Sequence, residues 1–236
     1  MARKRKFRPA SGRAASRTGS TRDKIIDAFL GLLAEKSFER IDFADIAGRA
    51  GVSLAELRGE FGSSFAILAA HIKDIDRAVL EGIDAGMAEE PPREQLFDVL
   101  MRRLELLAPH KEAVRSLMRS TARNPGLALA LNSLAVRSQQ WMLTAANISA
   151  AGPLGHVRAQ GLALLFANVL RTWIDDDEPG LARTLAALDR ALDSGQRWSG
   201  FLDDLCSLPG RICQRAKGPR GRARRSRRSG GEPMAA

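Results

Sequence analysis

The sequence has no tyrosine and only two cysteines among its 236 residues. Cys206 and Cys213 do not form a CxxC pair, so we expect neither a disulfide framework nor a zinc site. No run of eighteen apolar residues is present, which excludes a predicted transmembrane helix. The N-terminus also lacks the apolar segment of a secretory signal. Together these absences favour a protein of the reducing cytoplasm.

Catalytic signatures are absent as well. The sequence contains no nucleophile elbow, phosphate-binding Walker loop or dinucleotide fingerprint. An acidic run at 175–178 suggests a metal site, but it stands just before Pro179, where aspartates commonly cap the next helix. We favour the capping interpretation. The expectation is therefore a protein that is not an enzyme and has no cofactor and no bound metal.

The net charge of +10 is concentrated at the two ends of the chain. Residues 1–20 contain seven Lys/Arg and no acid, and residues 211–236 contain nine Lys/Arg and one acid. The remaining residues, 21–210, carry 21 basic and 26 acidic side chains, a net charge of −5. We predict a disordered basic arm at 1–20, which either contacts DNA or has no specific role. We also predict a disordered Arg-rich tail at 209–236, which would bind nucleic acid, anionic lipid or nothing in particular.

Residues 41–68 have the pattern of a helix-turn-helix. Phe43, Ile46 and Ala47 are spaced as the inner face of a helix requires. Gly51 supplies the positive φ of a sharp turn, and Ser53 is a helix-capping residue type placed before a second short helix. The second helix of such a motif commonly reads the major groove of DNA. The spacing predicts helices at about 21–36, 42–49 and 53–59, followed by a long fourth helix that is capped by Ser63 and keeps one apolar face as far as Ile83.

The rest of the chain is predicted to be helical. Prolines at 91, 92, 109, 125, 153 and 179 divide it into segments, and each segment repeats apolar residues every three or four positions. No segment alternates apolar and polar residues as a half-buried strand would. The predicted fold class is therefore all-α.

The N-terminal segment resembles the DNA-binding domain of TetR/AcrR-family transcriptional regulators, which are bacterial. The resemblance covers about fifty residues, from Thr21 to Leu68, and rests on an apolar frame in register with the turn Ala50-Gly51-Val52-Ser53. It implies a three-helix DNA-binding domain at 21–68 and a helical ligand-binding and dimerisation domain at 69–208. The implied function is a homodimeric regulator, commonly a repressor, that binds double-stranded operator DNA and responds to a small ligand.

Candidate DNA contacts come from this resemblance and from the outward positions of the third helix. The family commonly has an aromatic residue where Arg58 stands and a lysine where Ser64 stands. The candidates are Arg49, Ser53, Leu54, Ala55, Arg58, Gly59, Ser63 and Ser64.

Flexible methionines and flat aromatic rings in the body suit an adaptable apolar pocket, although ordinary core packing would also explain them. The absence of tyrosine favours a small hydrophobic ligand. The candidate pocket residues are Met101, Leu104, Met118, Trp141, Met142, Phe166, Asn168 and Trp173.

The last two predicted helices are apolar over much of their circumference, so each must be covered on several sides. The resemblance implies that such helices pair in a dimer. The candidate interface residues are Leu162, Leu165, Val169, Leu181, Leu185, Leu188 and Leu192.

An alternative function remains open. Residues 103–110, 171–177 and 184–192 resemble the TetR-fold lipid-binding proteins of ubiquinone biosynthesis, which do not read DNA. Residues 21–70 contain six Lys/Arg and eight Asp/Glu, a balance that suits such a protein better than a DNA reader. Only this alternative predicts membrane contact, through an amphipathic segment at 201–208.

Overall fold

The computed structural model describes residues 19–195, except 85, 87 and 88. The predicted basic arm (apart from residues 19 and 20), the segment at 201–208 and the Arg-rich tail lie outside this range. Within it every regular element is a helix, which confirms the predicted all-α class. The α-helices are α1 (Thr21–Glu35), α2 (Phe43–Ala50), α3 (Leu54–Glu60), α4 (Ser64–Glu81), α5 (Pro92–Leu107), α6 (Lys111–Arg123), α7 (Pro125–Ala145) and α8 (Gly152–Trp173). Short 3₁₀ turns, η1 (Phe38–Arg40) and η3 (Ala108–His110), join some of them, and residues 182–195 are also helical.

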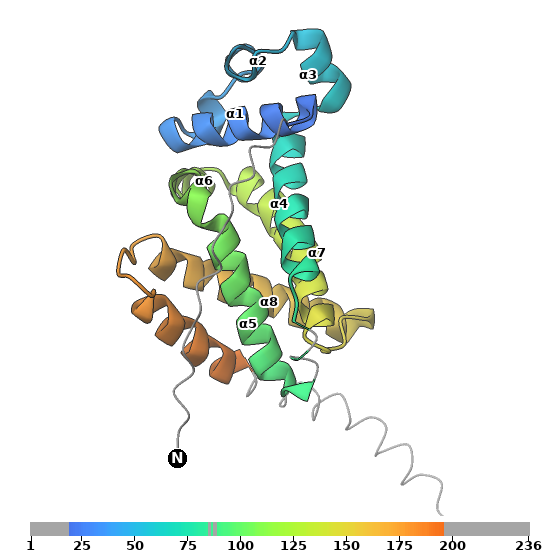
Figure 1. Ribbon diagram of the computed structural model, residues 1–236, viewed down its shortest axis with the longest axis vertical. Coiled ribbons are helices and arrows are strands. Elements are labelled where there is room, and N and C mark those ends of the chain that lie inside the picture. Colours follow the sequence, from blue (N-terminus) through green and yellow to red (C-terminus); the bar gives the residue numbers. More distant parts are fainter. Residues whose placement is uncertain (1–18, 85, 87–88, 196–236) are drawn as a thin grey trace, which may run out of the picture. The chain divides into compact units, whose positions relative to one another are not determined.

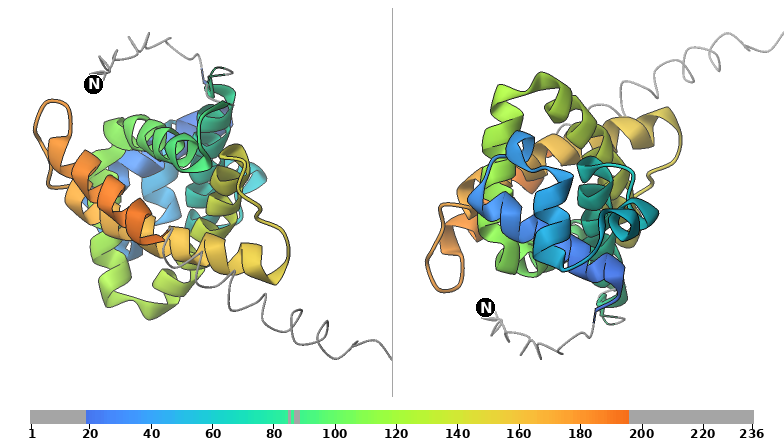
Figure 2. Two further views of the ribbon diagram at one scale, coloured as in Figure 1. Left: turned by 90° about the horizontal axis from the view of Figure 1, so that it is seen from below. Right: turned by 90° about the horizontal axis from the view of Figure 1, so that it is seen from above.

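The helices α1, α2 and α3, here called the head, are bounded by local signals. The side chains of Ser20, Asp42 and Ser53 each accept a hydrogen bond from a backbone N–H in the first turn of the helix that follows. Gly51 ends α2 with φ 66°, the left-handed conformation that its position predicts. The predicted helix-turn-helix geometry of 41–60 is thus present. Figure 1 shows the head grouped at one end of α4, and Figure 2 shows it from above.

The core of the head extends beyond the head itself. Phe29, Ile46 and Leu57 are buried together with the start of α4. The same cluster includes Ala113 and Leu117 of α6. Hydrogen bonds reinforce this junction, because Ser116 Oγ donates to the Lys36 carbonyl at 2.8 Å and Phe38 N donates to Ser120 Oγ at 3.1 Å. The head is therefore bound directly to α6 as well as to α4.

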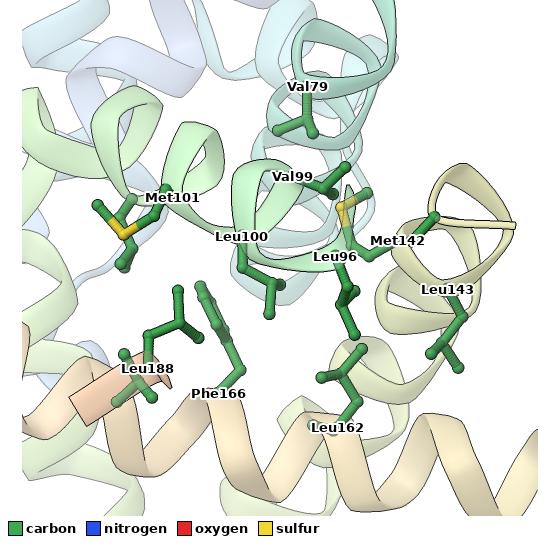
Figure 3. Packing of buried hydrophobic residues seen from close by; sticks show 14 of the residues in the cluster. Val79, Leu96, Val99, Leu100, Met101, Met142, Leu143, Leu162, Phe166 and Leu188 are labelled. Carbon is green, nitrogen blue, oxygen red and sulfur yellow. The ribbon is translucent and has the colours of Figure 1, made fainter. Parts of the chain in front are cut away.

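A second apolar cluster fills the body, which consists of α5 to α8 and the helical residues 182–192. Leu100 and Leu104 of α5 are fully buried. Figure 3 shows Leu162 and Phe166 of α8 pointing toward Leu96 and Leu100 of α5. Leu188 from the last helical segment joins the same cluster. None of the described helices is long and apolar enough to cross a membrane.

A buried ion pair connects α4 to the body. Arg103 Nη1 on α5 lies 2.6 Å from Asp76 Oδ1 on α4, and it also donates to Ser138 Oγ on α7 at 2.6 Å. Ser138 Oγ donates in turn to Asp76 Oδ1 at 2.7 Å. Three helices are thus joined at one polar point, and α4 runs from the head to this point beside α7 (Figure 1).

Candidate functional site

Nearly all residues of the helix α3 are exposed to solvent. Leu57 is buried and anchors the helix to the head, whereas all its other residues are exposed. Leu54 is 57% exposed, an unusual position for a leucine, and Ala55 lies next to it. A short, anchored helix with an outward face has the geometry required to enter a DNA groove.

The first turn of α3 is held by a capping box. Glu56 N donates to Ser53 Oγ at 3.2 Å, and Ser53 N donates to Glu56 Oε2 at 2.8 Å. Ser53 Oγ also donates to Glu56 Oε2 at 2.8 Å. These hydrogen bonds lower the pKa of Glu56. The Ser53 side chain is therefore engaged in capping, and Glu56 places a negative charge beside it.

The two predicted arginine contacts differ in their surroundings. Arg58 is exposed on α3, and within the described part of the chain no carboxylate pairs with it. Arg49 is bound to Glu35 through two contacts from Nη2, at 2.7 and 2.9 Å, which tie α2 to α1. Arg58 is therefore a free cation on the outer face, whereas Arg49 has a partner inside the head.

The N-terminus of α4 lies just beyond α3. Ala66 N donates to Ser63 Oγ at 3.1 Å, which confirms Ser63 as the cap. The first turn of α4 contains no acidic residue, and Ser64 is its first residue. The partial positive charge of such a helix end attracts phosphate. Gly59, the remaining predicted contact, is exposed on α3 and open to solvent at its Cα.

A cavity of about 700 Å³ lies where the head meets the body. Leu30 and Leu33 of α1 contribute to its wall, as do Leu68 and Ile72 of α4. The other walls come from α5, α6, α7 and α8, and most of the lining is apolar. The cavity is thus enclosed partly by the head itself, and its size suits a small organic molecule.

Two of the eight predicted pocket residues line this cavity, namely Met118 and Phe166. The other six positions need correction. Met101, Leu104, Met142 and Trp173 are buried in the body cluster instead. Trp141 is 59% exposed and Asn168 is also exposed, because both point away from the packed sides of α7 and α8.

The predicted pocket set did not include the polar residues of the cavity wall. His71, Arg103, His110 and Gln139 are among them. The two histidine rings meet edge to face, with centroids 5.0 Å apart. Burial and the neighbouring His110 lower the pKa of His71 to about 4, and burial lowers the pKa of His110 as well. Both imidazoles are therefore uncharged at neutral pH. The sequence signal of His71 is its place on an otherwise apolar helical face, whereas His110 lies in the turn η3 and has no such signal.

Four of the seven predicted dimer residues also need correction. Leu162, Val169, Leu188 and Leu192 are buried within the chain, where they form part of the body cluster. Leu165, Leu181 and Leu185 are partly buried against the same cluster. The four buried side chains are therefore not available for an interface, whereas the predictions for Leu165, Leu181 and Leu185 stay open. Val157 and Leu164 of α8, in contrast, are 48% and 60% exposed.

The acidic run at 175–178 has a structural role that the sequence predicted. Asp176 is buried, and its Oδ2 accepts hydrogen bonds from Thr184 N at 2.8 Å and Thr184 Oγ1 at 2.7 Å. It therefore caps the helical segment that begins at residue 182. Within the described residues, no group of three or more His, Cys, Asp or Glu side chains is placed to hold a metal ion.

Comparison with solved structures identifies the architecture. A TetR transcriptional regulator from Nitrosomonas europaea matches with a TM-score of 0.60 at 23% identity, over 75% of this chain and 99% of that one. A TetR transcriptional regulator from Rhodococcus sp. RHA1 matches with a TM-score of 0.53 at 22% identity, over 75% of this chain and 94% of that one. A TetR-family regulator from Streptomyces coelicolor matches with a TM-score of 0.54 at 16% identity, over 84% of this chain and 90% of that one. No family model and no curated protein matches the sequence. The chain therefore has the fold of the TetR-family transcriptional regulators.

Proposed function

We propose that the protein is a transcriptional regulator that binds operator DNA as a homodimer and responds to a small hydrophobic ligand. The observation that carries this proposal is the exposed face of α3, which is anchored by Leu57 alone and capped at its start by Ser53. The three solved structures described above are named as TetR transcriptional regulators, which supports the proposal. Leu54 and Ala55 would face the bases, and Arg58 would bind phosphate.

The charges of the head favour a small number of phosphate contacts. Within the described residues, Arg40 and Arg58 have no carboxylate partner, whereas Lys36 and Arg49 are paired with Asp45 and Glu35, and Lys24 lies within electrostatic reach of Glu56. The N-terminus of α4 adds a further anion-binding position. The basic residues of 1–20 would supplement this limited set, since a helix-turn-helix commonly uses such an arm.

A ligand in the cavity would influence the head directly. The wall includes α1 and α4 on one side and α6 on the other, and α6 holds the head through Ser116 and Ser120. These helices could adopt more than one separation. A ligand that binds more tightly to the conformation with one of these separations shifts the equilibrium toward that conformation. In a dimer, the spacing of the two α3 helices would change with it, and so would the affinity for a two-fold operator.

The dimer would form through the outer face of α8. Val157, Gly161 and Leu164 are exposed and follow one another at intervals of four and three residues, so they share one side of the helix. A substitution Val157→Arg would place a charge on each side of a two-fold interface and should shift the protein toward the monomer in sedimentation velocity. A variant that remains dimeric would place the interface elsewhere.

The regulator proposal is tested by DNA binding. The purified protein is titrated onto the DNA upstream of its own gene and onto a scrambled fragment of equal length, over a series of salt concentrations. Preference for the upstream fragment that persists at moderate salt supports a sequence-reading regulator. Equal binding with a steep salt dependence would assign all affinity to nonspecific phosphate contacts, and the proposal would fail.

The second candidate is a lipid-binding protein of the same fold that does not read DNA. The apolar cavity and the acidic balance of residues 21–70 favour it. Such a protein should copurify with extractable lipid that mass spectrometry detects, and it should bind neither DNA fragment. Selective DNA binding by lipid-free protein would reject this candidate.

A further inference from the structure

The wall of the cavity limits the ligand to a mainly hydrocarbon molecule. Leu33, Ile72, Leu107 and Phe166 come from four different helices and face the same space of about 700 Å³. Burial of apolar surface from such a ligand would contribute most of the binding free energy. The few polar groups of the wall then determine which functional group the ligand carries.

Gln139 is the most informative of these polar groups. It lies on α7 in the cavity wall and is 1% exposed. Its carbonyl oxygen, Oε1, is buried and accepts no hydrogen bond from any group in the described part of the chain. A buried acceptor without a donor destabilises the protein, because it has lost its hydrogen bond to water. A ligand that donates a hydrogen bond at this point would remove that cost.

Arg103 supplies a donor close to the same turn of α7. Its Nη1 is engaged with Asp76 and Ser138, and Ser138 directly precedes Gln139. Its Nε is buried and, among the described residues, has no acceptor. A hydroxyl group can donate to one atom and accept from another, so it matches an unpaired acceptor and an unpaired donor together.

The charges of the wall decide between neutral and ionised ligands. Among the described residues that line the cavity there is no aspartate or glutamate, whereas Arg103, Arg115, Arg119 and Arg171 are present. An ammonium group would donate to Gln139, but it would find no carboxylate in this lining, and the nearby carboxylates of Asp76 and Glu112 are already paired with Arg103 and Arg115. A carboxylate has no proton to donate to Oε1. Only a neutral donor satisfies both conditions.

We infer that the cavity binds a neutral, mainly aliphatic molecule with a hydroxyl group, and that Gln139 Oε1 accepts the hydrogen bond from this hydroxyl. The inference rests on the proposal that the cavity is the ligand site of the regulator. It concerns ligand binding alone, so its test contains no DNA. A protein that failed to read DNA could still bind the alcohol, and a sequence-specific DNA reader could still reject it.

The test uses four probes with the same ten-carbon chain: 1-decanol, decyl methyl ether, decanoate and decylammonium. Their dissociation constants with the full-length protein are measured by isothermal titration calorimetry. Decanol should bind about tenfold more tightly than the ether, which cannot donate a hydrogen bond. Decanoate and decylammonium should bind more weakly than decanol.

The variant Gln139→Met keeps the size of the side chain and removes its acceptor. It should bind decanol and the ether with equal affinity, while circular dichroism shows a thermal stability no lower than that of the parent. The matched control is Gln140→Met, the neighbouring glutamine, which does not line the cavity and should keep the tenfold preference. The inference is overturned if Gln139→Met retains the preference, if an ionised probe binds most tightly, or if no probe binds.

Discussion

Replacement of Arg58 by alanine should weaken DNA binding in a manner that can be calculated in advance. Arg58 is exposed on α3 and has no carboxylate partner in the described part of the chain, so its guanidinium is free to bind a phosphate. Each phosphate contact contributes about 0.9 to the slope of log K against log salt. The proposed homodimer would carry two copies of Arg58, so the variant should lower the magnitude of the slope by about 1.8.

The loss of affinity follows from the same two contacts. A hydrogen bond to a charged group contributes about 1.5–3 kcal/mol, so the loss of two should weaken operator binding on the order of a hundredfold or more. Fluorescence anisotropy with labelled upstream DNA, at five or more salt concentrations, gives both the affinity and the slope. Circular dichroism shows whether the head is still folded.

Arg77→Ala is the matched control for this measurement. Arg77 is a similarly exposed arginine on α4, with contacts to Asp74 at 3.5 Å and Glu81 at 3.8 Å on its own helix. It lies thirteen residues along α4 from Ser64, about 20 Å from the DNA-facing end of the helix. The reasoning is refuted if Arg58→Ala leaves the slope unchanged, or if Arg77→Ala lowers it equally.

Three other substitutions test separate parts of the structure. Glu56→Gln keeps the capping box but removes a negative charge from α3, so DNA binding should tighten, most at low salt; unchanged anisotropy titrations would contradict this. Asp76→Asn leaves the buried Arg103 without its counter-charge and should lower the free energy of unfolding by about 3–5 kcal/mol in urea. A loss below about 1 kcal/mol, as expected for an exposed pair, would be inconsistent with a buried one. His71 has its pKa lowered from 6.5 to about 4, so the unfolded chain binds more protons between these values. Its contribution to stability is complete above pH 6.5 and declines as the pH falls toward 4, by on the order of 3 kcal/mol. His71→Gln should therefore lose less stability over this range than the parent, and parallel pH profiles would disprove the assignment.

The head was predictable because its signals are local. The caps Asp42, Ser53 and Ser63 act on backbone groups three residues away, and Gly51 acts on its own backbone. Each of these signals can be recognised in a window of a few residues. The prediction therefore gave the start of α2, α3 and α4 correctly, with no knowledge of what packs against them.

The helices of the body were predicted from the sequence. The residues that each helical face packs against were not predicted. Periodicity shows that Leu162 and Trp141 lie on faces of their helices, yet Leu162 is buried and Trp141 is 59% exposed. The contacts that decide such positions join residues far apart in the chain. Arg103 and Asp76 are 27 positions apart, and no short-range pattern connects them. The cavity wall depends on six helices at once, so its polar members could not be selected from the sequence.

The capping box of α3 has a consequence for the bases that this protein would select. Ser53 and Glu56 satisfy each other, so the leading turn of the helix offers DNA an apolar surface made of Leu54 and Ala55. In the major groove the apolar group is the methyl of thymine. Under the proposed function, the operator would be recognised at this turn by the positions of its methyl groups. An operator with uracil in place of thymine keeps every base-pairing hydrogen bond but lacks these methyl groups. The protein should therefore bind it more weakly.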